Sequence, residues 1–257
     1  MRIDAVHNRR VKAWAQLQTV KERRKTGRFL IEGFHLVEEV LRSGWEVEAV
    51  LVEIGKPVPP VPGRVEVIQV SPAVMRRLSE TETPQGIVAV IKQKRWNWEA
   101  VLHRERLLLL VMDGVQDPGN LGTMIRIADA AGCDAVLLGE GTVDRFNGKT
   151  VRAAMGSLFH LPVADLELSV LWPQLRRAEV QLIGTSLNRA SITYVNHHYP
   201  QKLAVVVGNE GKGLSEQVLK AMDTTVHIPI IGQAESLNVA SAAGIILYEV
   251  ARQWGRV

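Results

Sequence analysis

The chain lacks several features that would assign it to common protein classes. Its 257 residues include one cysteine, Cys133, which excludes an internal disulfide framework and fits a reducing compartment. No run of eighteen apolar residues is present, so a transmembrane helix is excluded. The first ten residues lack the apolar core of a signal peptide. We therefore expect a soluble, cytoplasmic protein with no membrane partner.

Several kinds of site are also missing. The histidines show no spacing typical of metal ligands and one cysteine cannot build a zinc site, so no metal is expected. Residues 208–213 depart from the P-loop pattern, and residues 139–144 lack the third glycine of the dinucleotide fingerprint. The second absence disfavours a dehydrogenase-like enzyme. The glycines of 208–213 still expose backbone against which an adenine or a methionine-like tail could lie.

Positive charge is concentrated at the N-terminus. Residues 1–30 contain nine Lys or Arg and two acidic residues, although the net charge of the whole chain is only +4. A basic arm of this kind favours a polyanion, because phosphate contacts release counterions. A solvated helix face explains the same charges. The sequence leaves both interpretations open.

The pattern of expected strands and helices changes near residue 98, which divides the chain into two segments. The first alternates short elements, which predicts a small α/β domain of about 70 residues. We expect its strands at residues 29–31, 47–52, 65–70 and 86–91, and its helices at 34–41 and 72–78, the second capped by Ser71. The linker is placed at residues 92–98.

The second segment has longer and more regular alternation. Continuous apolar runs occur at residues 107–112, 135–138, 161–164, 180–184, 203–207 and 225–230. Such runs are buried on both faces, which predicts a parallel sheet flanked by helices. The helices are expected at residues 121–131, 148–157, 169–178, 215–222 and 238–253.

Three polar, glycine-marked segments follow buried strands: residues 113–122, 208–215 and 228–238. Loops at the carboxyl ends of parallel strands meet at one edge of the sheet, so these segments predict one composite site. Asn120 lies where a helix N-terminus offers free N–H donors. Arg126 either serves this site or pairs with a carboxylate. Glu210 is a carboxylate at a strand end, and Ser236 is a candidate N-cap of the last helix.

In order, residues 111–132, 205–215 and 228–244 resemble the three motifs of the SpoU/TrmH family of RNA ribose 2′-O-methyltransferases, in the SPOUT class. Residues 29–39 are similar to the L30e-like substrate-binding domain often fused to this family. The resemblance implies an α/β fold in two domains. Residues 96–257 would form a SPOUT methyltransferase domain, a parallel sheet flanked by helices with a deep trefoil knot. Residues 1–95 would form a basic arm and a small L30e-like domain that binds the RNA substrate.

The resemblance also implies S-adenosylmethionine as cofactor and a homodimer whose site draws on both chains. By motif position, the catalytic-site residues are Asn120, Arg126, Glu210, Ser236 and Asn238. The cofactor-binding residues are Thr185, Gly208, Gly211, Ile228, Ile230 and Leu237. A guanidinium is a poor base. Arg126 therefore acts either as the family's proposed base or as an electrostatic clamp on the phosphate and the developing alkoxide.

The implied reaction is 2′-O-methylation of a ribose in RNA. An L30e-like domain with a basic arm favours ribosomal RNA, in particular large-subunit RNA. The alternatives are a transfer RNA 2′-O-methyltransferase and a non-catalytic RNA-binding relative. The five polar positions disfavour the second, because a pure binder would not need them. The sequence does not distinguish a housekeeping enzyme from one that confers antibiotic resistance, and it does not identify the nucleotide.

Overall fold

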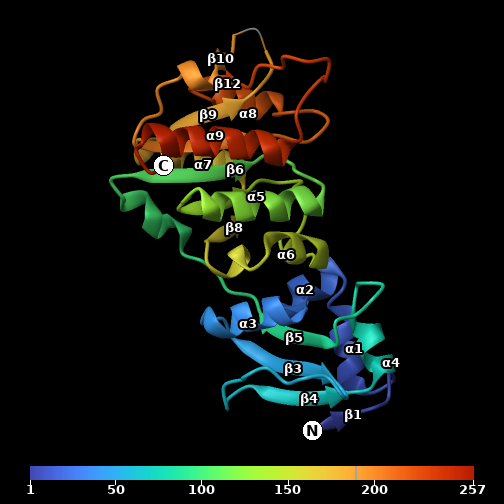
Figure 1. Ribbon diagram of the computed structural model, residues 1–257. Helices are drawn as coiled ribbons and strands as arrows, with labels where there is room; N and C mark the ends of the chain where they lie inside the picture. The colour runs from blue at the N-terminus through green and yellow to red at the C-terminus, as the bar shows by residue number, and fades with distance from the viewer. Residues whose placement is uncertain (189) are drawn as a thin grey trace. The chain divides into compact units, whose positions relative to one another are not determined.

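The computed structural model describes residues 1–188 and 190–257. They form two compact units (Figure 1). The N-terminal unit comprises Met1–Arg95 and Asp144–Phe159, and the C-terminal unit comprises Trp96–Val143 and His160–Val257. The sequence-based division at residue 95 groups residues 144–159 with the C-terminal part, whereas the structure packs them within the N-terminal unit.

The N-terminal unit contains a mixed five-stranded sheet in the order β1-β4-β3-β5-β2. β1, β4 and β3 are parallel, and β5 is antiparallel to both β3 and β2. The strands are β1 (Arg2–Ile3), β2 (Arg28–Glu32), β3 (Val47–Glu53), β4 (Glu66–Val70) and β5 (Ile87–Lys92). The helices are α1 (Arg9–Gln16), α2 (Val20–Thr26), α3 (Phe34–Arg42), α4 (Pro72–Leu78) and α6 (Gly148–Ala154), with a 3₁₀ turn, η2 (Ser157–Phe159).

The basic N-terminal segment is folded and is not a free arm. It forms β1, α1 and α2, and its apolar residues Val11, Trp14 and Leu17 are buried in the core on one face of the sheet. The amphipathic spacing of these residues turns the apolar side of α1 inward and leaves most of its charges outside. The segment expected to form a basic arm is therefore part of the folded N-terminal unit.

Aromatic contacts explain why residues 144–159 belong to the N-terminal unit. The ring centroid of Phe29 lies 4.5 Å from that of Phe146 and 6.0 Å from that of Trp45. Trp45 packs edge-on against Phe159 at 5.5 Å, and its indole N–H donates to the Phe159 carbonyl oxygen at 3.1 Å. These buried rings close the core from residues far apart in the chain.

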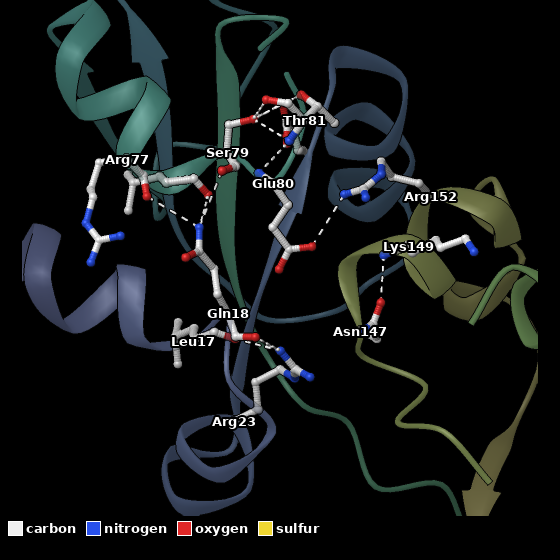
Figure 2. Close-up of polar contacts among 12 residues, drawn as sticks. Leu17, Gln18, Arg23, Arg77, Ser79, Glu80, Thr81, Asn147, Lys149 and Arg152 are labelled. Carbon is white, nitrogen blue, oxygen red and sulfur yellow. Dashed lines mark hydrogen bonds and ion pairs between the residues drawn. The ribbon is translucent and has the colours of Figure 1, made fainter. Parts of the chain in front are cut away.

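A buried ion pair fixes the same segment to helix α2. The Arg23 guanidinium lies 2.7 Å from the Asp144 carboxylate, and only 4% of the Arg23 side chain is exposed. Arg23 also donates to the carbonyl oxygens of Leu17 and Gln18, each at 2.9 Å (Figure 2). The cation is thus satisfied by one carboxylate and two carbonyl groups, as burial of a charge requires.

The C-terminal unit contains a seven-stranded sheet in the order β10-β12-β9-β11-β6-β7-β8, and every pairing is parallel. The strands are β6 (Leu107–Met112), β7 (Ala135–Leu138), β8 (Val163–Asp165), β9 (Gln181–Thr185), β10 (Ile192–Thr193), β11 (Lys202–Val207) and β12 (Thr224–His227). The helices are α5 (Pro118–Ala130), α7 (Leu168–Arg177), α8 (Glu216–Ala221) and α9 (Val239–Gln253), with 3₁₀ turns η1 (Trp98–His103) and η3 (Tyr194–Asn196).

The predicted parallel sheet flanked by helices is confirmed, and β6, which lies between β11 and β7, is buried along its whole length. The largest difference in a strand boundary is at the end of β12. The apolar run 225–230 predicts a strand to Ile230, but β12 ends at His227 and the chain leaves the sheet at Ile228. Among the helices of the described residues, none has the length and apolar character needed to cross a bilayer.

The Arg23–Asp144 pair yields a stability prediction. Asp144→Ala leaves a buried guanidinium without its carboxylate, so the free energy of unfolding should fall by about 3–5 kcal/mol. Denaturant unfolding followed by circular dichroism and tryptophan fluorescence measures this change. Asp4→Ala, which removes the exposed partner of Arg2 in the same unit, is the matched control and should have little effect. Equal effects of the two substitutions would contradict the prediction.

Candidate functional site

The three polar segments meet at one edge of the C-terminal sheet. The first follows β6, the second follows β11 and the third follows β12, and the strand order β12-β9-β11-β6 places these strands close together. Because all are parallel, their carboxyl ends share one edge. Thr185, at the end of β9, lies at the same edge. The prediction of a single composite region is consistent with this topology.

The Glu210 carboxylate joins the second segment to the first. One carboxylate oxygen accepts from the backbone N–H of Gln116 at 3.1 Å, and the other accepts from that of Asp117 at 3.0 Å. The side-chain amide of Asn120 donates to Glu210 at 3.1 Å. Asn238 in turn donates to the Asn120 side-chain oxygen at 2.9 Å. A continuous hydrogen-bonded path therefore connects Glu210, Asn120 and Asn238.

These contacts fix the charge state of Glu210. Partial burial alone would raise the pKa of its carboxyl group. The hydrogen bond from Asn120 and the backbone N–H groups outweigh that effect, and the pKa lies below its ordinary value of 4.5. The site therefore holds an ionised carboxylate at neutral pH.

The two helices at the site begin with side-chain caps. Asp117 caps α5 by accepting from the Asn120 backbone N–H at 2.8 Å. Asn238 caps α9 by accepting from the backbone N–H groups of Ala240 and Ser241 at 2.9 and 3.3 Å. The expectation that Ser236 caps the last helix is wrong. Ser236 is exposed and lies in the loop before the cap.

The second segment is a tight turn that depends on glycine. The backbone of Asn209 exchanges two 2.9 Å hydrogen bonds with Gly213. A Cβ atom on Gly208 would lie 2.1 Å from the carbonyl carbon of Gly213, so only glycine fits there. The Asn209 side chain accepts from the N–H of Gly211 at 3.0 Å and donates to the Gly114 carbonyl oxygen at 2.9 Å.

Sequence reasoning missed Asn209 and Asp113 as site residues. Asp113 accepts from the backbone N–H of Ser215 at 2.7 Å, which adds a second link between the first two segments. A polar residue within two positions of the end of a buried strand was a usable signal in both cases. Neither residue stands out by charge or spacing alone, because what they contact is set by loops distant in sequence.

A cavity of about 440 Å³ lies beside the second and third segments. Five of the six predicted cofactor residues line it: Thr185, Gly211, Ile228, Ile230 and Leu237. Gly208 does not line it but permits the turn that does. Of the predicted catalytic residues, Glu210 and Ser236 line the cavity. Its size suits a small organic ligand, and its wall combines exposed backbone with apolar side chains.

Three predicted catalytic residues lie outside the cavity lining. Asn120 and Asn238 are connected to it through Glu210. Arg126 lies on α5, its side chain is exposed, and it makes no hydrogen bond or ion pair with any residue that the structure describes. Pairing with a carboxylate was one interpretation of Arg126 from the sequence. The described part of the chain offers no such partner.

Other reactive side chains lie elsewhere. Cys133 is buried, and burial raises the pKa of its thiol, which fits a small core residue. Within residues 1–188 and 190–257, no group of three or more His, Cys, Asp or Glu side chains is placed to hold a metal ion.

Comparison with known proteins connects this geometry to a family. Residues 107–248 match the family model of the SpoU rRNA methylases, and residues 8–89 match that of the MRM3-like substrate binding domain. The chain is 45% identical to the 23S rRNA (guanosine(2553)-2′-O)-methyltransferase RlmP of Bacillus subtilis, over 96% of this chain and 98% of that protein.

Two solved structures agree with the sequence matches. An AdoMet-bound rRNA methyltransferase from Sinorhizobium meliloti has a TM-score of 0.88 and 31% identity, covering 98% of this chain and 97% of that one. The SpoU methyltransferase AviRb from Streptomyces viridochromogenes, in complex with AdoMet, has a TM-score of 0.88 and 31% identity, covering 96% and 98%. With its three motifs at one sheet edge beside a cofactor-sized cavity, the chain belongs to the SpoU rRNA methylase family.

Proposed function

We propose that this chain transfers a methyl group from S-adenosylmethionine to the 2′-hydroxyl of a ribose in large-subunit ribosomal RNA. The observation that carries the proposal is the Glu210 network beside the cavity of about 440 Å³. The similarity to a 23S rRNA 2′-O-methyltransferase at 45% identity supports the same reaction and RNA.

The cavity residues fit such a cofactor. The Gly208 turn brings exposed backbone to the wall, where an adenine can be bound by N–H and C=O groups. Ile228, Ile230 and Leu237 provide apolar contact for the remainder of the molecule. When bound, S-adenosylmethionine supplies an activated methyl group on a sulfonium. Thr185, Gly208, Gly211, Ile228, Ile230 and Leu237 are therefore proposed as the cofactor residues.

The reaction at the ribose depends on polar side chains of the protein. In the transfer, the oxygen of the ribose 2′-hydroxyl would bond to the methyl carbon as the carbon–sulfur bond breaks, and the hydroxyl proton would pass to solvent. Arg126 is proposed to hold the adjacent phosphate and to stabilise the developing oxyanion, which suits an unpaired guanidinium. Glu210, Asn120 and Asn238 keep the loops in place, and Ser236 in the cavity wall contacts the ribose or the loop.

The proposal includes a homodimer. Arg126 does not line the cavity of its own chain, so a second copy is needed to bring the two together. Helices α5 and α9 pack against each other (Figure 1), and Ile127 of α5 lies close to Gly244 of α9. Beside them, Ile245 and Tyr248 of α9 are 37% and 45% exposed. These apolar side chains suit a contact with a second copy.

Two finer points complete the proposal. The C-terminal unit forms a deep trefoil knot, which is supported by the position of β12, the last strand in the chain, inside the sheet between β10 and β9. The protein is proposed to act in the cytoplasm, and its single cysteine is consistent with that compartment.

Methyl transfer to protein-free 23S rRNA and to bulk transfer RNA tests the reaction. Digestion to nucleosides and mass spectrometry should reveal a 2′-O-methyl nucleoside from the 23S rRNA only, and the name of the 45% identical relative makes guanosine the first to examine. A 2′-O-methyl nucleoside from transfer RNA alone would show that the substrate is transfer RNA and not ribosomal RNA. A methylated base would refute the ribose assignment, and cofactor binding without any product would favour a binding-only relative.

Within that assay, Arg126→Ala should lower the methylation rate by roughly 10²–10³-fold, as loss of one charge-stabilising donor does. Affinity for S-adenosylmethionine, measured by calorimetry, should stay close to wild type because Arg126 does not line the cavity. Arg177→Ala removes an exposed arginine of α7 and serves as the matched control. Full turnover by Arg126→Ala would refute this role.

Glu210→Gln tests the link between the first two segments. The amide replaces one acceptor oxygen by a donor that faces N–H groups, so the free energy of unfolding should fall by about 1–3 kcal/mol at neutral pH, with weaker cofactor binding. Because the folded-state pKa of Glu210 is lowered, its contribution is complete well above pH 4.5 and is lost as the pH falls below that value. Unfolding measured against pH should show the gap between wild type and variant closing only in that acidic range. Glu216→Gln, at an exposed carboxylate, is the control; a gap that does not depend on pH would contradict the assignment.

Tyr248→Asp tests the dimer. A carboxylate in the apolar contact should yield a monomer by light scattering, with methylation lost and cofactor affinity reduced much less. Val170→Asp places the same charge on another exposed apolar position, on α7, and should leave the mass unchanged. A monomeric wild-type protein with full activity would rule out the shared site.

A further inference from the structure

Helices α1 and α4 lie side by side over one face of the N-terminal sheet (Figure 1). The hydroxyl of Ser71, the N-cap of α4, donates at 2.8 Å to the carbonyl oxygen of Asp4, in the loop between β1 and α1. At their last turns, the Gln18 side-chain amide lies 3.3, 3.2 and 3.4 Å from the carbonyl oxygens of Arg77, Leu78 and Ser79 (Figure 2). Hydrogen bonds from the residues that flank α1 therefore reach both ends of α4.

The outer surface of this helix pair carries positive charge only. Arg9 and Lys12 are exposed on α1, and Arg76 and Arg77 are exposed on α4. We call these four residues the α1–α4 face. Neither helix contains an acidic residue. Among the residues that the structure describes, none forms a hydrogen bond or ion pair with these four side chains. Figure 2 likewise shows no contact at the Arg77 guanidinium.

Nearby cations differ from these four. Arg10, also on α1, makes two hydrogen bonds to the Glu66 carboxylate at 3.0 and 2.5 Å and lies over the Trp14 ring. Arg23 is buried against Asp144. Each of these two arginines, which stabilise the fold, is therefore paired with a carboxylate of the same unit. The α1–α4 face is left unneutralised, although four like charges on adjacent helices repel one another.

Acidic side chains lie in and beside the loop that follows α4. Glu32 accepts from the hydroxyls of Ser79 and Thr81, each at 2.6 Å, and Glu80 pairs with Arg152 at 3.6 Å. Glu82 is exposed in the same loop. Carboxylates at this end of the unit disfavour a phosphate chain, so charge directs a polyanion to the helix pair and away from the loop.

We propose that the α1–α4 face binds the phosphate backbone of the RNA substrate. This inference rests on the proposed function, which makes that substrate ribosomal RNA. Lys and Arg on helix surfaces contact phosphates without reading bases, so the face supplies affinity and orientation, and nucleotide selection lies elsewhere. Each phosphate contact releases counterions and makes binding depend on salt.

The test compares equal losses of charge in the same unit. Arg76→Gln/Arg77→Gln and Arg9→Gln/Lys12→Gln each remove two charges from the α1–α4 face. Lys56→Gln/Arg64→Gln removes two exposed, unpaired charges from the loop between β3 and β4 and is the matched control. Filter binding to a protein-free 23S rRNA transcript is measured between about 50 and 200 mM KCl.

Each double variant of the face should weaken RNA binding roughly tenfold or more and lower the slope of log K against log[KCl] by about two, one for each cation removed. In methylation assays the KM for RNA should rise while kcat is kept. S-adenosylmethionine affinity and the unfolding transition should match wild type, since exposed Arg→Gln changes rarely alter stability. The control should behave as wild type.

Two results would overturn the inference, and they are distinguishable from failure of the proposed function. Wild-type salt slopes in both face variants would show that the helices carry a solvated charge face only. An equal loss in the control would show that total charge matters and position does not. If the wild-type protein neither binds nor methylates the 23S transcript, the proposed function fails together with this surface.

Discussion

The Glu210 carboxylate is the contact on which the candidate site depends. It draws two backbone N–H groups and the Asn120 amide onto one side chain, and so fixes the loop after β6 against the loop after β11. The side-chain oxygen of Asn120 accepts a hydrogen bond from Asn238, the N-cap of α9, so the third segment is attached to the same network. Three segments that lie between residues 113 and 238 are thereby joined through one ionised group and the two amides connected to it. Glu210, at the centre of this network, also lines the cavity.

Much of the fold was predictable because its signals are local. Runs such as Leu107–Met112 are apolar at every position, and only strands buried on both faces need that. Ser71 before Pro72 marks a helix start that the structure confirms, since its hydroxyl accepts from the Val74 N–H. The three polar segments were found because glycine, proline and amide residues interrupt apolar runs.

What escaped sequence reasoning depends on contacts made across the chain. Ser236 and Asn238 are both good caps, and the Asn120 hydrogen bond favours Asn238, which no local pattern shows. Ile228 and Ile230 continue an apolar run, but they serve the cavity and not the sheet. The basic N-terminal segment is amphipathic only when Val11, Trp14 and Leu17 are considered together. In the core, these residues share a cluster with residues as distant in the sequence as Val90.

The segment Asp144–Phe159 has a consequence for biosynthesis. Phe29 and Trp45 emerge from the ribosome early, but Phe146 and Phe159, which complete their cluster, follow the first two strands of the parallel sheet, β6 and β7. At synthesis rates of roughly 5–20 residues per second, several seconds pass between the synthesis of Trp45 and that of Phe159. The first unit therefore cannot finish folding before the second is under way. A fragment that ends at residue 95 would keep its strands, yet it would expose the aromatic surface that the intact chain covers.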